Sequence, residues 1–153
     1  MSMLAKISAP DEFAARMLDP LQSLFALAAR CYVSWQFLKS GWLKVTSWDQ
    51  TIYLFENEYH TPVLSPHVAA VAGAFGELFF PTLLVLGLAG RLSAIGLFAV
   101  NAMAVISYSN VLLAEGSEAA LGQHILWGTL LAFLILYGPG KISLDYLLNR
   151  KRF

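Results

Sequence analysis

Residues 68–113 read VAAVAGAFGELFFPTLLVLGLAGRLSAIGLFAVNAMAVISYSNVLL, and this stretch decides the fold. It contains two apolar runs, 68–88 and 92–113, each close to the ~20 residues that an α-helix needs to cross the hydrocarbon core of a bilayer. The short sequence from Gly87 to Arg91 (GLAGR) joins them. That connection is too short for anything but a tight turn, so the stretch predicts two membrane-spanning helices in a hairpin.

The rest of the chain has the composition of a membrane protein. Of its 153 residues, 58% are hydrophobic and 13% are charged, with a mean hydropathy of +0.61. Soluble domains carry about 25% charged residues. Two more apolar runs, 21–45 and 120–137, flank the hairpin, and the last ends at the helix stop GPG at 138–140. We therefore predict an all-α polytopic membrane protein, a bundle of four transmembrane helices in a single membrane domain over residues 1–153.

The charges indicate an orientation in the membrane rather than a charged partner. Ten Lys and Arg balance ten Asp and Glu, so we expect no nucleic-acid surface. Cytoplasmic loops are enriched in Lys and Arg. Loops 46–66 and 114–119 contain acidic residues but no basic ones, and Lys44 stands at the boundary. Both termini are therefore predicted to be cytoplasmic, since the basic residues on their side are Lys6, Arg16, Arg91, Lys141, Arg150, Lys151 and Arg152.

The loop after the first span carries its own helical pattern. Trp48, Ile52, Phe55 and Tyr59 recur at helical spacing, with acidic residues elsewhere around the turn. The pattern predicts a short amphipathic helix over residues 48–59, which the prolines at 62 and 66 end before the second span. This helix either lies at the membrane surface and positions two spans, or folds as a lid over a cavity between the helices.

Two ionisable residues fall inside the predicted spans. Arg30 lies near the middle of the first span and Glu77 near the middle of the second. An unpaired charge at that depth costs about 2.5–3.5 kcal/mol. We therefore predict that Arg30 and Glu77 face each other and share hydrogen bonds. The pair is either structural and fixes helix register, or catalytic, with Arg30 setting the pKa of a carboxylate that carries a proton or binds a ligand.

Polar residues nearer the outer surface complete the candidate site. Lys44 lies on the same helical stripe as Arg30, and His124 begins the fourth span. His124 is either an interfacial residue or a catalytic proton-relay partner of Glu77, because histidine titrates near neutral pH. We expect Lys44 and His124 to guard the outer entrance. Asn101 in the third span is placed to reach the bundle interior, where it either packs helices together or contacts a ligand.

Aromatic side chains suggest the ligand. Trp35, Phe37 and Phe80 either belong to ordinary bundle packing or line a slot for a flat hydrophobic ring, such as the head group of a quinone. Metal ligands are less well supported. His60 and His67, with acidic residues near them, lie on the outer side at spacings that match no strict ligand pattern, so no metal site is predicted.

Five features of the chain together resemble the DoxX family of small four-helix bacterial membrane proteins. They are the mid-span Arg30, the sequences SGWLK at 40–44 and GEL at 76–78, the hairpin LGLAGRL at 86–92, and the closing stretch YGPGKISLD at 137–145. The closing stretch is the most specific of these. The resemblance covers roughly residues 24–148, and the outer loop is similar to that of one subgroup of the family.

The resemblance implies a quinone-linked redox setting in the bacterial inner membrane. We expect a subunit or accessory of a quinone-linked redox, oxidative-stress or metal-stress module, with other membrane or periplasmic redox proteins as partners. The sequence contains no haem, iron–sulfur, flavin or nucleotide motif, so the chain is at most a membrane subunit of an oxidoreductase. The alternative is a non-catalytic scaffold or a small-molecule transporter. Glycine-rich helix faces also allow a homo-oligomer.

Overall fold

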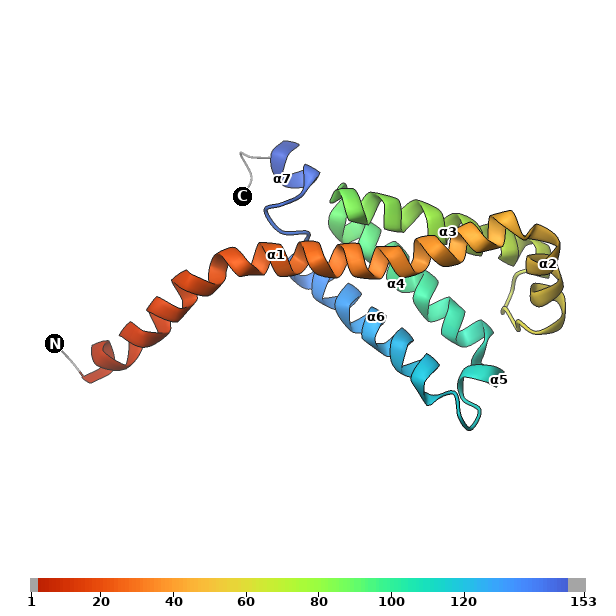
Figure 1. Cartoon of the computed structure of the whole chain (residues 1–153), viewed down its shortest axis with the longest axis horizontal. Helices are drawn as coiled ribbons and strands as arrows, with labels where there is room; N and C mark the ends of the chain where they lie inside the picture. The colour runs from red at the N-terminus through yellow and green to blue at the C-terminus, as the bar shows by residue number, and fades with distance from the viewer. Residues whose placement is uncertain (1–2, 149–153) are drawn as a thin grey trace.

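A computed structural model describes residues 3–148, and within that range the regular structure is entirely helical (Figure 1). This confirms the all-α prediction. The helices are α1 (Met3–Thr46), α2 (Trp48–Asn57), α3 (Pro66–Leu86), α4 (Gly90–Ser107), α5 (Ser109–Leu112), α6 (Glu118–Tyr137) and α7 (Leu144–Leu148).

Three of the described helices, α3, α4 and α6, are long and apolar enough to cross a membrane. They correspond to the predicted second, third and fourth spans. The helix α1 is also long enough, at 44 residues, but Arg30, Lys39 and Lys44 interrupt its apolar sequence. The crossing of α1, and with it the count of four spans, stays a prediction.

The helices associate in two pairs. The most extensive contacts are those of α1 with α3 and of α4 with α6. The pairs lie close together near the turn between α3 and α4, and they diverge toward α2 and α5 (Figure 1). Where they meet, a buried apolar core is shared by Ala26, Ala29, Val33, Phe37, Leu84, Ala94, Leu97, Leu131 and Leu134. The opposite end of the bundle is therefore open for a cavity.

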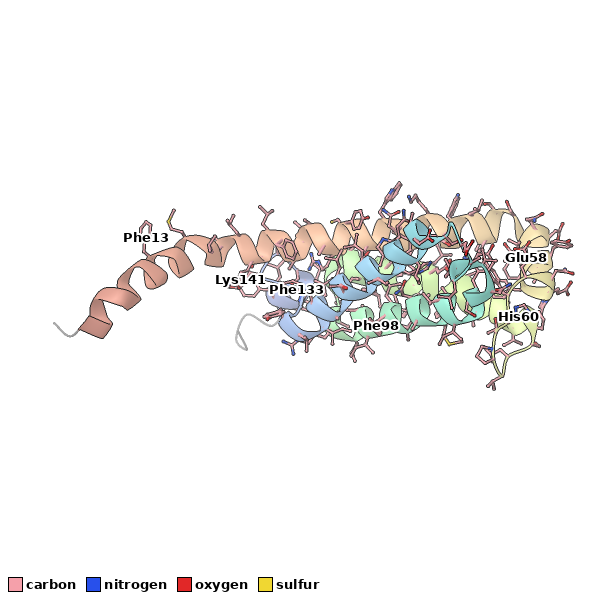
Figure 2. All side chains as sticks on the ribbon, turned by 90° about the horizontal axis from the view of Figure 1, so that it is seen from below. Phe13, Glu58, His60, Phe98, Phe133 and Lys141 are labelled. Atoms are coloured by element: carbon pink, nitrogen blue, oxygen red, sulfur yellow. The ribbon has the colours of Figure 1, made fainter. Side chains whose placement is uncertain are left out.

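Two helix boundaries differ from the sequence predictions. The first helix begins at Met3 rather than near residue 21, and its first part projects beyond the bundle, where Figure 2 shows Phe13 far from the other helices. The predicted third span, 92–113, is broken at Tyr108 into α4 and α5. The Ser107 carbonyl accepts a hydrogen bond from the His60 N–H at 2.7 Å instead of from the next helical turn, which explains the break.

The predicted tight hairpin between α3 and α4 is confirmed. Gly87 ends α3 with φ at +68°, a left-handed conformation that glycine adopts at little cost. The next helix starts at Gly90, and its first N–H groups are capped by a distant side chain. The Asp145 carboxylate accepts hydrogen bonds from the N–H groups of Ala89 and Gly90, at 2.9 and 2.7 Å. A carboxylate at this position also compensates the positive end of the helix dipole.

The two ends of the bundle differ in charge, as the sequence predicts. Glu58 and His60 lie at the end opposite to Lys141 (Figure 2). Arg91 approaches Gly138 at the Lys141 end, which brings two of the predicted cytoplasmic segments together. The other basic residues used for the orientation, Lys6, Arg16, Arg150, Lys151 and Arg152, lie outside the described side chains.

Candidate functional site

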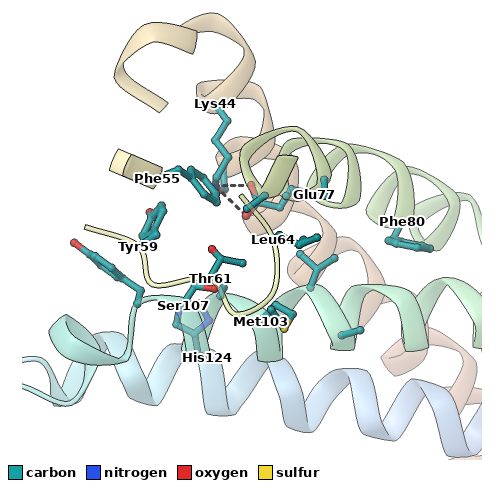
Figure 3. A pocket seen from close by; sticks show the side chains of 18 of the residues that line it. Lys44, Phe55, Tyr59, Thr61, Leu64, Glu77, Phe80, Met103, Ser107 and His124 are labelled. Carbon is teal, nitrogen blue, oxygen red and sulfur yellow. Dashed lines mark hydrogen bonds and ion pairs between the residues drawn. The ribbon is translucent and has the colours of Figure 1, made fainter. Parts of the chain in front are cut away.

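A cavity of about 410 Å³ occupies the open end of the bundle (Figure 3). Its walls come from α1, α3, α4 and α6, and its roof comes from Phe55 in α2 and the loop that follows. Small and apolar side chains make up most of the lining. The polar side chains that line it are Ser40, Lys44, Tyr59, Thr61, Glu77, Ser107, Tyr108 and His124.

An ion pair between Lys44 and Glu77 is the strongest polar feature of the cavity. The Lys44 ammonium donates to Glu77 Oε2 at 2.7 Å and Oε1 at 2.9 Å, and to Ser40 Oγ at 2.8 Å. The two side chains are only 17% and 8% exposed. Gly41 makes the approach possible, because a Cβ there would lie 3.0 Å from the Glu77 Cβ. The three acceptors match the three hydrogens of the ammonium group.

The predicted amphipathic helix is confirmed as α2, which ends at Asn57, and it covers the cavity. The Thr51 hydroxyl donates to the Lys44 carbonyl at 3.0 Å and ties α2 to the end of α1. Phe55 packs on Ala69 and Ala70 of α3. Its ring also meets that of Tyr59 edge to face, at 4.6 Å between centroids. This placement matches the lid interpretation of the helix.

The loop after α2 completes the roof. The Tyr59 ring meets the Tyr108 ring edge to face at 4.8 Å, and the Tyr108 hydroxyl donates to Glu58 Oε2 at 3.3 Å. Burial raises the pKa of Tyr59, and the neighbouring Tyr108, Glu77 and Glu58 raise it further. Burial, followed by the charge and hydrogen bond of Glu58, also raises the pKa of Tyr108. Both phenols therefore remain protonated at neutral pH and can donate hydrogen bonds.

The Thr61 hydroxyl is the unsatisfied polar group of the cavity. Its oxygen is buried and makes no hydrogen bond within the described structure, while the residue lines the cavity. Buried polar groups of folded proteins are nearly always hydrogen-bonded, so an unpaired hydroxyl on a cavity wall is available to a ligand. No helical pattern marks Thr61 in the sequence, because it lies in an irregular loop.

His124 and Asn101 form a polar pair between α6 and α4. His124 Nδ1 lies 2.8 Å from Asn101 Oδ1, and the Asn101 amide donates to the His124 carbonyl at 3.0 Å. His124 lines the cavity, whereas Asn101 supports it from behind. The Trp127 ring packs on the other side of the imidazole, with the centroids 4.9 Å apart. Asn101 thus orients His124, which no spacing in the sequence predicted.

The predicted pairing of Arg30 with Glu77 is wrong. The Arg30 guanidinium donates to the carbonyls of Pro139 at 2.8 Å and Ile142 at 2.7 Å, in the turn after α6. It lies against Gly87, ten residues beyond Glu77, and a rise of 1.5 Å per residue puts the two about 15 Å apart along α3. The prediction that Arg30 and Lys44 share one face of α1 was correct. The predicted depth of Arg30 in the bundle was wrong, because α1 extends well beyond the assumed span.

The prediction that Trp35, Phe37 and Phe80 together line one slot for a ring is also wrong. Trp35 is 60% exposed and points away from the bundle, and Phe37 is buried in the core against Trp127. Two residues apart on a helix are about 200° apart around its axis, so Trp35 and Phe37 cannot share a wall. Of the three, Phe80 lines the cavity, where its ring packs over Gly96.

The outer histidines do not come together as metal ligands. Within the residues that the structure describes, no three side chains of His, Cys, Asp or Glu approach one another closely enough to hold a metal ion. The His67 ring instead meets the Trp48 ring edge to face, at 6.2 Å between centroids.

These features define a class of protein: helical membrane proteins with a ligand-sized cavity between their spans and a short helix that covers the outer end of the cavity. The model of the DoxX family matches residues 25–110, more than half of the chain, and the chain belongs to the DoxX family. The matched range includes Lys44, Glu77 and the roof, and it ends before His124 and the closing turn. Comparisons with curated proteins and with solved structures find no match.

Proposed function

We propose that the cavity binds the head group of a lipid-soluble quinone, and that the protein serves as a membrane subunit or accessory of a quinone-linked redox or stress-response module. One observation carries the proposal: a mostly apolar cavity of about 410 Å³ contains a buried ion pair and an unpaired hydroxyl. Cavities of roughly 300–1,000 Å³ with apolar walls and a few polar groups are typical of small-molecule sites.

The residues present suit a quinone ring. Its carbonyl oxygens accept hydrogen bonds, and the Thr61 hydroxyl is free to donate one. Phe80 offers an apolar surface for the ring, and the ion pair of Glu77 with Lys44 supplies a buried polar group beside it. A bound quinone would supply the electron acceptance that the side chains of the chain lack. His124, oriented by Asn101, is the proposed proton-exchanging group on the opposite wall.

The proposal includes an orientation. With the basic end of the bundle in the cytoplasm of a bacterial cell, the roof of the cavity faces the outer side of the inner membrane. A partner that delivers or removes electrons would then approach from the periplasm, over α2 and the loop at residues 58–65.

The test is a titration of decylubiquinone into the purified protein in lipid nanodiscs, followed by quenching of tryptophan fluorescence. Trp127 is an internal reporter, because its ring packs on His124 at the cavity wall. We expect saturable quenching by the wild type. Glu77→Gln and Lys44→Met should each weaken binding about tenfold, since a change of ~1.4 kcal/mol in binding free energy corresponds to that factor.

The matched control is Lys39→Met. Lys39 lies on the same helix as Lys44 but is exposed, with its ammonium 5.9 Å from the Trp35 ring. It should leave the affinity unchanged. All variants are first checked for helix content and a single size-exclusion peak. An absence of saturable quenching in folded wild type, or an equal loss in Lys39→Met, would contradict the proposal.

The second candidate function is a non-catalytic scaffold, and the saturated hydrogen bonding of Lys44 favours it. All three ammonium hydrogens already have acceptors within the protein. In a scaffold, Glu77→Gln would prevent stable accumulation because it leaves a buried charge unpaired. The charge-free double variant Lys44→Met with Glu77→Gln would then restore accumulation, and wild type would bind no quinone.

A further inference from the structure

The exposed part of the cavity lining lies on one side only. Leu64, Ala72, Ala99 and Met103 line the cavity and are exposed. They belong to α3, α4 and the loop before α3. The lining residues from α1, α2 and α6 are all buried or half-buried. The cavity therefore opens between α3 and α4, away from the ion pair.

This opening lies at the depth of the acyl chains. Ala99 is nine residues from the start of α4, or about 14 Å along a helix whose full length is close to the ~30 Å thickness of the hydrocarbon core. Since α3 and α4 are both apolar enough to span the membrane, exposure at this level is exposure to lipid.

The cavity is elongated along the helices and polar at one end. Its lining extends over residues 69–80 of α3 and 96–107 of α4, about 16 Å along each helix. Thr61 and Tyr108 lie at the roof, whereas Phe80 and Gly96 form the apolar inner end, as Figure 3 shows for the labelled side chains. Ala72 and Ala99 are both small and exposed, and they lie beside the close contact between Gly76 of α3 and Val100 of α4.

The geometry points to a ligand that is dissolved in the bilayer and enters sideways between α3 and α4. It is an amphiphile whose polar head occupies the cavity beside Glu77 and whose hydrocarbon chain leaves on the exposed side of the lining, past Ala72, Ala99 and Met103. The inference rests on the proposed function, and it adds the route of entry and the path that the hydrocarbon chain takes. A water-soluble ligand would need an opening through the roof, which α2 and the following loop cover.

The experiment compares two probes on the protein in nanodiscs: decylubiquinone and the same benzoquinone without its decyl chain. Affinities are expressed relative to the amount of probe dissolved in the lipid. We expect Ala99→Phe and Ala72→Phe to weaken decylubiquinone binding about tenfold, because each side chain fills space that the chain needs. Binding of the chainless probe should be weakened less, because that probe has no chain to meet the new side chains. Ile106→Phe is the matched control, since Ile106 is exposed on α4 outside the cavity lining.

The outcomes separate this inference from the proposed function. Equal weakening of both probes by the alanine variants, or no weakening of either, would overturn the lateral opening and leave quinone binding intact. If folded wild type binds neither probe saturably, the proposed function fails, and the lateral entry fails with it. If either Ala72→Phe or Ala99→Phe does not fold, the binding measurements on the other variant test the inference, because the two substitutions lie on different helices.

Discussion

The Tyr59 and Tyr108 phenols lie in the roof of the cavity, close to carboxylates. These surroundings keep the phenols protonated. Tyr108 donates to Glu58, and Tyr59 lies near both Glu58 and Glu77. A phenolate here would be desolvated and would meet carboxylates. The pKa of each phenol is therefore raised, first by burial and then by negative charge.

These pKa values predict how stability depends on pH. Folding keeps both phenols protonated above the pH of about 10 at which an unfolded tyrosine ionises. The unfolded chain therefore binds fewer protons than the folded chain in that range, and stability declines as the pH rises through the folded pKa values. Below about pH 10 the phenols are protonated in both the folded and the unfolded chain, so their titration does not change the stability there. Ultraviolet difference titration of the folded protein should show phenolate forming late, and Tyr59→Phe should remove part of that late component.

The control for this titration is Tyr53→Phe, which removes an exposed phenol from α2. The late component should persist in this variant. A late component that is unchanged in both Tyr59→Phe and Tyr108→Phe would show that the roof does not hold these phenols as described.

At the scale of elements, Arg30 fastens α1 to the turn after α6. Its two hydrogen bonds to the carbonyls of Pro139 and Ile142 join segments more than 100 residues apart in the chain. Asp145 then caps α4 from the same turn. A single short segment, residues 139–145, thus holds three helices at the inner end of the bundle.

This arrangement predicts a separation of stability from binding. Arg30→Gln removes two charge-assisted hydrogen bonds and should lower the free energy of unfolding by about 1.5–3 kcal/mol. It should leave the affinity for decylubiquinone unchanged at temperatures where the variant is folded, because Arg30 is absent from the cavity lining. Thermal unfolding and the quinone titration, run on the same nanodisc samples, measure the two effects.

Arg91→Gln is the control, since Arg91 is exposed at the same end of the bundle. It should change neither stability nor affinity appreciably. Loss of quinone binding in folded Arg30→Gln would instead place Arg30 in the ligand site, as the sequence alone predicted.

At the scale of the whole molecule, the distribution of charge predicts the topology. In a Cys31→Ser background, single cysteines replace Phe13, Glu56 and Lys141, which are all exposed. A membrane-impermeant maleimide applied to intact spheroplasts should label the site at 56, and the other two only after permeabilisation. Labelling at residue 13 from outside would show that α1 does not cross the membrane.

The sequence predicted the features that depend on local pattern. The tight hairpin follows from glycines at a short connection, the end of α6 from GPG, and α2 from an amphipathic period. The depth of Arg30 did not follow, because no local signal marked the true start of α1. The unpaired Thr61 hydroxyl could not be foreseen either, since its position depends on how an irregular loop folds back onto α4.

The divergence of the two helix pairs has a mechanical consequence. Hydrogen bonds from Arg30 and Asp145 hold the helices together at the inner end, whereas at the outer end the two pairs are joined through the loop after α2, by the hydrogen bond from the His60 N–H to the Ser107 carbonyl. A bilayer exerts lateral pressure that varies with depth and lipid shape. We therefore expect the separation of the two helix pairs at the outer end, and with it the volume of the cavity, to vary with the lipid composition around the protein.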